Sequence, residues 1–174
     1  MNLKDNFEKI YCINLDRRTD RWEESLIEFK KWGIEGNVER YSAVDGKSLS
    51  VESLNNFLDL GNMGLITTHI NILEEAIKEG YENILLLEDD VYFTPEILKY
   101  QEYLDLVPSD WDMIYFGGNH NLHMGAQLNK INEKVAKLHS TYGLQCIVVK
   151  NTIFKPMLDV IKEKELMFIV IVLE

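Results

Sequence analysis

Cysteine is scarce in this sequence of 174 residues, and the cysteines that occur match no known disulfide or metal-binding motif. Only Cys12 and Cys146 occur, and each stands in an apolar, strand-like stretch. Such surroundings favour buried free thiols over a disulfide, and the spacing matches no cysteine-based metal site. A chain of this length can bury roughly 70% of its unfolded surface, so we expect a stable core without covalent cross-links.

Long apolar runs are also missing. Residues 1–16 contain no apolar signal-peptide segment, and the apolar stretch 166–173 is far too short to span a bilayer. We therefore expect no transmembrane segment and a location on the cytoplasmic side. No linker rich in proline, glycine or serine and no internal repeat divides the chain, so a single domain over residues 1–174 is expected.

Basic residues are outnumbered by acidic ones. Lysine and arginine together number 18 against 29 aspartates and glutamates, which gives a net charge of −11. This balance argues against nonspecific binding to nucleic acid or to an anionic membrane, because both require clusters of positive charge. It is compatible with an anionic ligand in a local basic site.

Strand patterns alternate with helical patterns along the chain. The apolar run 83–88 is typical of a central strand covered on both faces, and residues 64–80 carry apolar side chains at helical spacing before Gly80. Asp20 and Glu23 resemble a capping box. The expected strands are 10–15, 38–44, 83–88, 111–118 and 144–150; the expected helices are 21–32, 51–60, 64–80, 94–104 and 151–164, with a polar loop over 119–134. This order predicts an α/β fold with a mostly parallel central sheet.

Three adjacent acids, Glu88, Asp89 and Asp90, follow the predicted central strand. If the extended conformation continues, Glu88 and Asp90 point to one side and Asp89 to the other. Their oxygens suit a hard divalent cation, Mg²⁺ or Mn²⁺, that keeps positions for water and a diphosphate. Such a cation would stabilise a leaving diphosphate as a Lewis acid. A second interpretation stays open, in which the acids cap the next helix or face water.

Two arginines, Arg17 and Arg18, follow the first predicted strand at the start of a helix. Guanidinium groups and the backbone N–H groups of a helix N-terminus both favour phosphate. Pairing with Asp16, Asp20 or Glu24 on a solvated helix is equally compatible with the sequence. The carboxyl ends of strands carry the ligand sites of such sheets, and the arginines, the acids and the glycine pair 117–118 all follow predicted strands.

Six stretches taken together carry a family resemblance: INLDRRTDRW, YSAVDGKSL, GNMGLITTHINILEEAI, ILLLEDDVYF, WDMIYFGG and TYGLQCIVVK. In this order, over about residues 10–165, they resemble glycosyltransferase family 25, which includes lipooligosaccharide and procollagen galactosyltransferases. The resemblance implies a GT-A-like nucleotide-binding sandwich. It also implies inverting transfer of a sugar, commonly galactose from UDP-galactose, to a saccharide or hydroxylysine-type acceptor, with Mn²⁺ or Mg²⁺ as cofactor.

The resemblance also implies roles for particular residues. EDD resembles the Asp-x-Asp metal motif, which makes Asp90 the main metal ligand, Glu88 a second ligand or a neighbour of the ribose, and Asp89 a neighbour in the nucleotide site. INLDRR resembles the floor of the nucleotide pocket, and AVDG resembles a second nucleotide-side loop. The implied nucleotide-site candidates are Asn14, Leu15, Arg17, Arg18, Val44, Asp45 and Gly46.

An inverting transfer needs a general base for the acceptor hydroxyl, and the sequence assigns none. His120 and His123 follow the FGG motif on the expected active-site side and are the catalytic candidates, with solvated loop histidines as the other interpretation. Asp112 precedes its strand, which predicts a place at the opposite end of the sheet. His69, a lone histidine on a helix, is more typical of a structural residue.

The chain departs from the family pattern in three ways. Thr68-His69 stands where the family has Ser-His, which keeps the hydroxyl group. The chain is short and has no Pro-x-Asp segment, so the C-terminal part of the family domain is expected to be missing. These departures favour an alternative function, a catalytically degenerate member that acts as a binding or assembly module. A phosphatase of the haloacid-dehalogenase type is disfavoured, because Glu88 replaces its Asp nucleophile and lies far into the chain.

Overall fold

The computed structural model describes residues 3–49, 60–117, 128–138 and 143–163. Its strands are β1 (Lys9–Leu15), β2 (Glu39–Ala43), β3 (Asn83–Glu88), β4 (Met113–Tyr115), β5 (Leu128–Lys130), β6 (Ala136–Leu138) and β7 (Cys146–Lys150). Its α-helices are α1 (Thr19–Trp32), α2 (Leu60–Glu79), α3 (Tyr100–Leu104) and α4 (Asn151–Glu163). Short 3₁₀ helices are η1 (Leu3–Asp5), η2 (Gly46–Ser48) and η3 (Pro95–Lys99). No described helix is long and apolar enough to cross a membrane.

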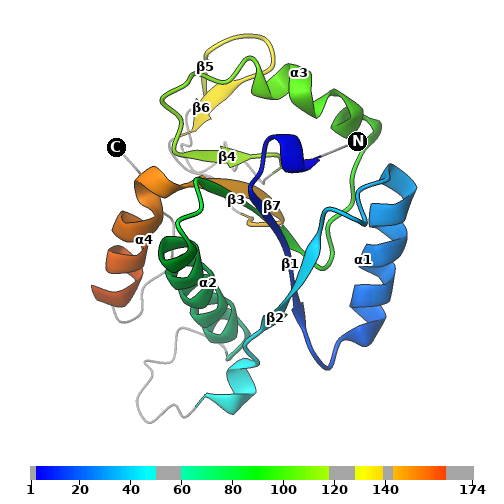
Figure 1. The fold of residues 1–174 in the computed structure, drawn as a ribbon, viewed down its shortest axis with the longest axis vertical. Coiled ribbons are helices and arrows are strands. Elements are labelled where there is room, and N and C mark those ends of the chain that lie inside the picture. Colours follow the sequence, from blue (N-terminus) through cyan, green and yellow to red (C-terminus); the bar gives the residue numbers. More distant parts are fainter. Residues whose placement is uncertain (1–2, 50–59, 118–127, 139–142, 164–174) are drawn as a thin grey trace.

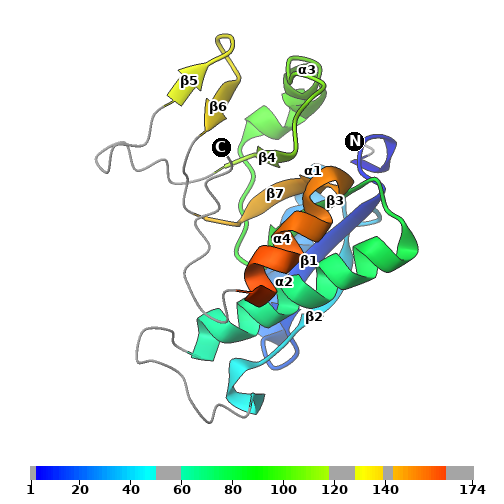
Figure 2. The same ribbon diagram turned by 90° about the vertical axis from the view of Figure 1, so that its left-hand side faces the viewer.

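A five-stranded sheet in the order β2-β1-β3-β7-β4 forms the centre of the fold. β1 pairs in parallel with β2 and β3, whereas β7 runs antiparallel to its neighbours β3 and β4. Helix α1 covers one face of this sheet, and α2 and α4 lie side by side on the other (Figures 1 and 2). The predicted fold class, α/β with a mostly parallel central sheet, is confirmed.

The run Ile84–Leu87 on β3 fills both layers of the core, and all four side chains are buried. Ile84 and Leu86 pack among residues of α2 and α4, while Leu85 and Leu87 pack with Phe29 of α1. This division follows the two-residue period of a strand. It explains why the run is apolar throughout, since a strand with helices on both faces has no solvent side.

Helix α1 ends as predicted but begins differently. Gly33 adopts the left-handed conformation with φ 66°, and its N–H group bonds to the carbonyl groups near the helix end. The capping-box prediction is wrong, because Asp20 lies inside α1 and pairs with Arg18, which occupies the N-cap position without a side-chain cap. The helix therefore begins before the predicted Arg21.

Strand β7 is the principal surprise of the topology. It enters between β3 and β4 in the antiparallel sense, a direction that its apolar sequence does not reveal. The β5-β6 hairpin occupies part of the predicted polar loop, while residues 118–127 lie outside the described part of the chain. The predicted helix 51–60 also falls outside it, apart from Leu60 at the start of α2.

Candidate functional site

Three loops meet at one edge of the sheet. The pairing of β1 with its neighbours sets Leu15 beside Ala43 and Ile13 beside Glu88, so β1, β2 and β3 end at nearly the same level. The chain moves from β1 to β2 on one side and then to β3 on the other, which makes the β1-β3 boundary a topological switch point. Ligands bind outside such points in open α/β sheets. The edge gathers every predicted nucleotide and metal residue that the structure describes.

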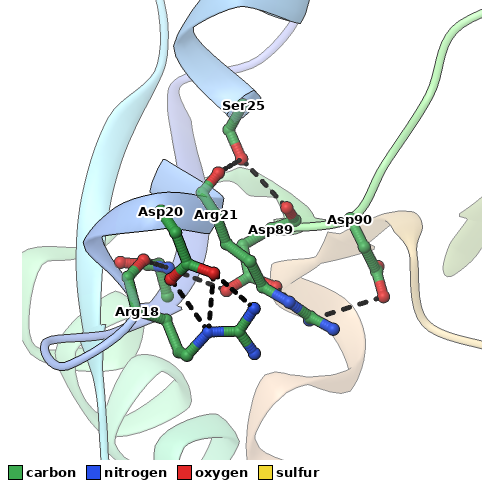
Figure 3. A network of polar contacts seen from close by, with 7 residues as sticks. Arg18, Asp20, Arg21, Ser25, Asp89 and Asp90 are labelled. Carbon is green, nitrogen blue, oxygen red and sulfur yellow. Dashed lines mark hydrogen bonds and ion pairs between the residues drawn. The ribbon is translucent and has the colours of Figure 1, made fainter. Parts of the chain in front are cut away.

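The acidic stretch forms a tight turn at this edge. Strand β3 ends at Glu88, and the Val91 N–H group donates to the Glu88 carbonyl oxygen at 3.2 Å. The expectation of a continued extended chain is therefore wrong for Asp90. Arg21 Nη1 lies 2.8 Å from Asp89 Oδ1 and 3.6 Å from Asp90 Oδ2, which brings the two aspartates to one guanidinium (Figure 3). Arg21 supplies part of the positive charge that the acids require.

Asp89 is an anchored residue. Its side chain is 12% exposed, and its Oδ2 accepts a hydrogen bond from Asn14 Nδ2 at 2.7 Å. Ser25 Oγ lies 3.1 Å from the Asp89 carbonyl oxygen and holds the backbone of the turn against α1. Asn14 is 1% exposed and also donates to the Arg18 carbonyl oxygen and accepts from Arg40 Nε. Asn14 and Asp89 therefore connect the loops after β1 and β3. Asn14 would lie beneath a nucleotide pocket and fix the position of its floor.

Glu88 and Asp90 stand in different surroundings. Asp90 is 51% exposed at its side chain. Glu88 continues the alternation of Ile84 and Leu86 on the α2 side of the sheet, and burial together with the charges of Asp90 and Asp89 raises the pKa of its carboxyl to about 7. The raised pKa of Glu88 indicates a carboxyl group short of counter-charge, and Asp90 has Arg21 at 3.6 Å. A divalent cation would supply the missing charge.

No three His, Cys, Asp or Glu side chains within the described ranges gather into a complete metal cluster. A cation held by Asp90 and Glu88 would therefore take its remaining ligands from water and from phosphate oxygens. Mg²⁺ commonly binds in this way, through one or two carboxylates and the substrate phosphates. The described residues fit such a cation on these terms.

The predicted arginines pair with neighbouring acids at the surface. Arg17 Nε donates to Asp45 Oδ2 at 2.7 Å and links the loops after β1 and β2. Arg18 pairs with Asp20 on the same helix, as the solvated-helix interpretation expects, and Arg40 with Asp16. Exposed pairs of this kind contribute little to stability, so an anionic ligand could exchange partners with Arg17 and Arg18 at little cost.

The AVDG loop is fixed by an unusually close approach to α2. A Cβ atom built on Gly46 would lie 1.5 Å from the Leu60 carbonyl oxygen, and one on Gly64 would lie 2.3 Å from the Val44 carbonyl oxygen. The Val44 N–H group donates to Thr68 Oγ1 at 2.9 Å, and that hydroxyl donates to the Gly64 carbonyl oxygen at 2.7 Å. Thr68, completely buried, explains why a hydroxyl is needed before His69.

We expect Thr68→Val to destabilise the protein by about 1–3 kcal/mol, because the partly buried Val44 N–H group loses the acceptor that the completely buried Thr68 provides. Thr68→Ser keeps the hydroxyl and is the matched control, expected to lose only the smaller contribution of one methyl group. Urea unfolding of both variants measures the difference. Equal stability of the two variants would contradict the role given to the hydroxyl.

The histidines fall into two groups. His69 is buried, its Nδ1 lies 2.9 Å from the Leu65 carbonyl oxygen, and burial lowers its pKa, so the ring is neutral at pH 7. Its Nε2 has no hydrogen-bond partner among the described residues. His120 and His123 lie outside the described part of the chain, so their catalytic role stays a prediction. Asp112 accepts from the Lys150 N–H group at the opposite end of the sheet, as expected.

Arg21 and Arg40 also lie at this edge, although no sequence pattern predicted them as site residues. The available signal was the third arginine of DRRTDRW, Arg21, which lies in the first turn of α1 and contacts Asp89. Arg40 carried no local signal, because its role depends on the parallel pairing of β2 with β1. Together they make the edge richer in arginine than the predicted pair alone.

A hollow of about 340 Å³ adjoins the acidic turn. Asp90, Tyr92, Gly117 and Gln145 are among the residues that line it. The Glu88 N–H group donates to the Gln145 carbonyl oxygen at 3.0 Å, so the segment entering β7 borders the same edge. The hollow lies on the β7-β4 side of Asp90, whereas the arginine-bearing loops lie on the β1-β2 side.

The family model for glycosyltransferase family 25, described as an LPS biosynthesis protein family, matches residues 7–162. This chain belongs to glycosyltransferase family 25. The matched range includes all three loops of the edge.

Several curated relatives in this family are similar to the chain. It is 34% identical over 128 residues to a glycosyltransferase 25 family member of Anopheles gambiae, covering 62% of this chain and 21% of that protein. It is 31% identical over 134 residues to procollagen galactosyltransferase 2 of Mus musculus, covering 66% and 21%. Human inactive glycosyltransferase 25 family member 3 is 29% identical over 134 residues, covering 66% and 22%. The matched part thus spans about a fifth of these relatives.

Among solved structures, a glycosyltransferase involved in glycosylation of the major capsid of PBCV-1 is similar to the chain. The TM-score is 0.46 at 13% identity, and the match covers 90% of this chain and 65% of that one.

Proposed function

We propose that this chain forms the donor-binding part of a metal-dependent glycosyltransferase that uses a UDP-sugar. Galactose is the proposed sugar, transfer is with inversion, and a saccharide or hydroxylysine-type group is the acceptor. The observation that carries the proposal is the convergence of the INLDRR, AVDG and EDD loops at the β1-β3 switch point of a family 25 chain. This arrangement combines surface arginines with the acidic turn, in which burial and two neighbouring aspartates leave Glu88 short of counter-charge.

Different residues of the edge are proposed to bind the diphosphate and the cation. Arg17 and Arg18 would contact the anionic diphosphate after releasing Asp45 and Asp20, since surface ion pairs exchange at little cost. Asp90 and Glu88 would hold Mn²⁺ or Mg²⁺. That cation, when bound, neutralises charge on a leaving diphosphate. Asp89 and Asn14 would keep the loops in register, because both side chains are already used within the protein.

A second candidate is a binding or assembly module without catalysis. It is favoured by the similarity to an inactive human family member. Both candidates predict a folded nucleotide site. Only the enzyme predicts turnover of the donor sugar.

Calorimetric titration of UDP into the 174-residue chain, with and without Mn²⁺, tests the proposal. We expect binding that strengthens at least about tenfold when Mn²⁺ is present, which corresponds to roughly 1.4 kcal/mol. Absence of binding under both conditions would reject the donor site. Release of galactose from UDP-galactose then separates the enzyme from the binding module.

A further inference from the structure

A second hollow, rich in aromatic side chains, adjoins the one at Asp90. Its volume is about 170 Å³, and it shares Tyr92, Phe93, Phe116 and Cys146 with the larger hollow. The floor is apolar and well packed, formed by the buried side chains of Leu3, Phe7, Leu85 and Cys146. The two hollows therefore form one continuous depression that begins at the acidic turn.

Exposed aromatic rings and polar groups border this depression. Tyr92 is 74% exposed, only two residues from Asp90, and Phe116 is 36% exposed and packs edge-on against Phe7 at 6.2 Å between ring centres. The Tyr103 hydroxyl donates to the Glu96 carboxylate, and both residues line the smaller hollow. Large exposed aromatic rings beside a few fixed polar groups are the usual composition of a small-ligand site.

The depression lies beside β7 and β4, away from the loops after β1 and β2 that are proposed to bind the nucleotide. The arginine-bearing loops follow β1 and β2, whereas Phe116 follows β4 and Cys146 begins β7. The sheet order β2-β1-β3-β7-β4 sets Asp90, after β3, between the two groups. A second substrate in the depression would therefore approach the Asp90 turn from the side opposite the nucleotide.

The chemistry of the lining selects among ligands. An acyl chain needs a longer apolar channel than a hollow of about 170 Å³. The half-exposed Asp90 disfavours an anionic ligand, whereas Glu96 is paired with Lys99 at 3.2 Å and adds little net negative charge. A neutral sugar ring has an apolar face of C–H groups and an edge of hydroxyl groups. The ring faces of Tyr92 and Phe116 can pack against the apolar C–H face of the sugar. The Glu96 carboxylate and the Tyr103 hydroxyl can form hydrogen bonds with its hydroxyl groups.

We propose that the depression bounded by Tyr92, Phe116, Glu96 and Tyr103 binds a neutral saccharide, with Tyr92 as its exposed stacking platform. The bound saccharide is an acceptor only if the proposed glycosyltransferase function holds, so this inference rests on the proposed function. The binding itself depends only on the described lining.

Saturation-transfer NMR on the full 174-residue chain, with lactose and maltose as separate probes, tests the inference. Wild-type protein should bind at least one probe, and Tyr92→Ala should weaken that binding by about tenfold or more, as truncation of a central aromatic contact does. Tyr92→Phe keeps the ring and should stay within about threefold of wild type. Ile27→Ala, which truncates a 70% exposed side chain on α1, is the matched control and should change nothing.

The outcomes separate this inference from the proposed donor site. Failure of wild-type protein to bind either disaccharide, or equal binding by Tyr92→Ala, overturns the inference whatever UDP does. Failure of UDP to bind, with disaccharide binding that depends on Tyr92, overturns the donor proposal and leaves the saccharide site standing. Because Tyr92 is largely exposed, loss of binding at an unchanged melting temperature identifies a local effect.

Discussion

Gly64→Ala is expected to prevent stable folding. The added Cβ would lie 2.3 Å from the Val44 carbonyl oxygen and 2.7 Å from the Gly46 nitrogen, both of which belong to the backbone. Neither atom can move away without shifting the loop after β2 or the first turns of α2. We expect a loss on the order of 4–5 kcal/mol, which is most of the stability of a marginal domain. Urea unfolding monitored by circular dichroism measures it.

The matched control for Gly64 is Gly36, which lies in an open turn. No atom comes within 4 Å of a Cβ built on Gly36. Gly36→Ala should leave stability unchanged or raise it by up to about 1 kcal/mol, because alanine restricts the unfolded chain. If Gly64→Ala unfolds at the same urea concentration as Gly36→Ala, the close approach of α2 to the AVDG loop is refuted.

Asp90→Asn is expected to lower the affinity for UDP in the presence of Mn²⁺ by about 10- to 100-fold, without loss of the fold. The substitution keeps the size of the side chain but removes the anionic ligand, and changes around a metal commonly cost 10- to 100-fold in affinity. Asp90 is half exposed and forms an ion pair with Arg21 at 3.6 Å. Removing its charge also relieves repulsion on Glu88. Calorimetry with UDP and Mn²⁺ measures the loss.

Two further variants define what the Asp90 result means. Asp89→Asn should lower the melting temperature instead, because it weakens the pair with Arg21 in a side chain that is 12% exposed. Glu35→Gln changes an exposed acid just beyond α1 and should affect neither quantity. Metal-dependent UDP binding that survives in Asp90→Asn would remove Asp90 from the proposed site.

Much of the fold follows from local signals in the sequence. The run Ile84–Leu87 is apolar because helices cover both faces of β3, and Gly33 and Gly80 end their helices in positive φ conformations. The family motifs then predicted which loops would meet, since each follows a strand of the sheet. These signals are short-range, so one sequence is enough to read them.

The remainder depends on contacts between distant segments. The direction of β7 is set by its insertion between β3 and β4, and its apolar residues suit either direction. The anchoring of Asp89 by Arg21 spans 68 residues, and the approach of Gly64 to Val44 requires α2 to be docked. Asp20 matched a capping signature, but its carboxylate pairs with the Arg18 guanidinium instead of capping the helix. No local pattern distinguishes such outcomes.

The insertion of β7 also has a consequence for the order in which the chain becomes protected during synthesis. β1 leaves the ribosome before β3 and can cover one of its edges at once. The other edge of β3 stays open until β7 has been made, because β7 and not β4 is its hydrogen-bonded neighbour. An apolar strand with one open edge pairs readily with other chains. The nascent chain is therefore most prone to aggregation between the completion of β3 and that of β7.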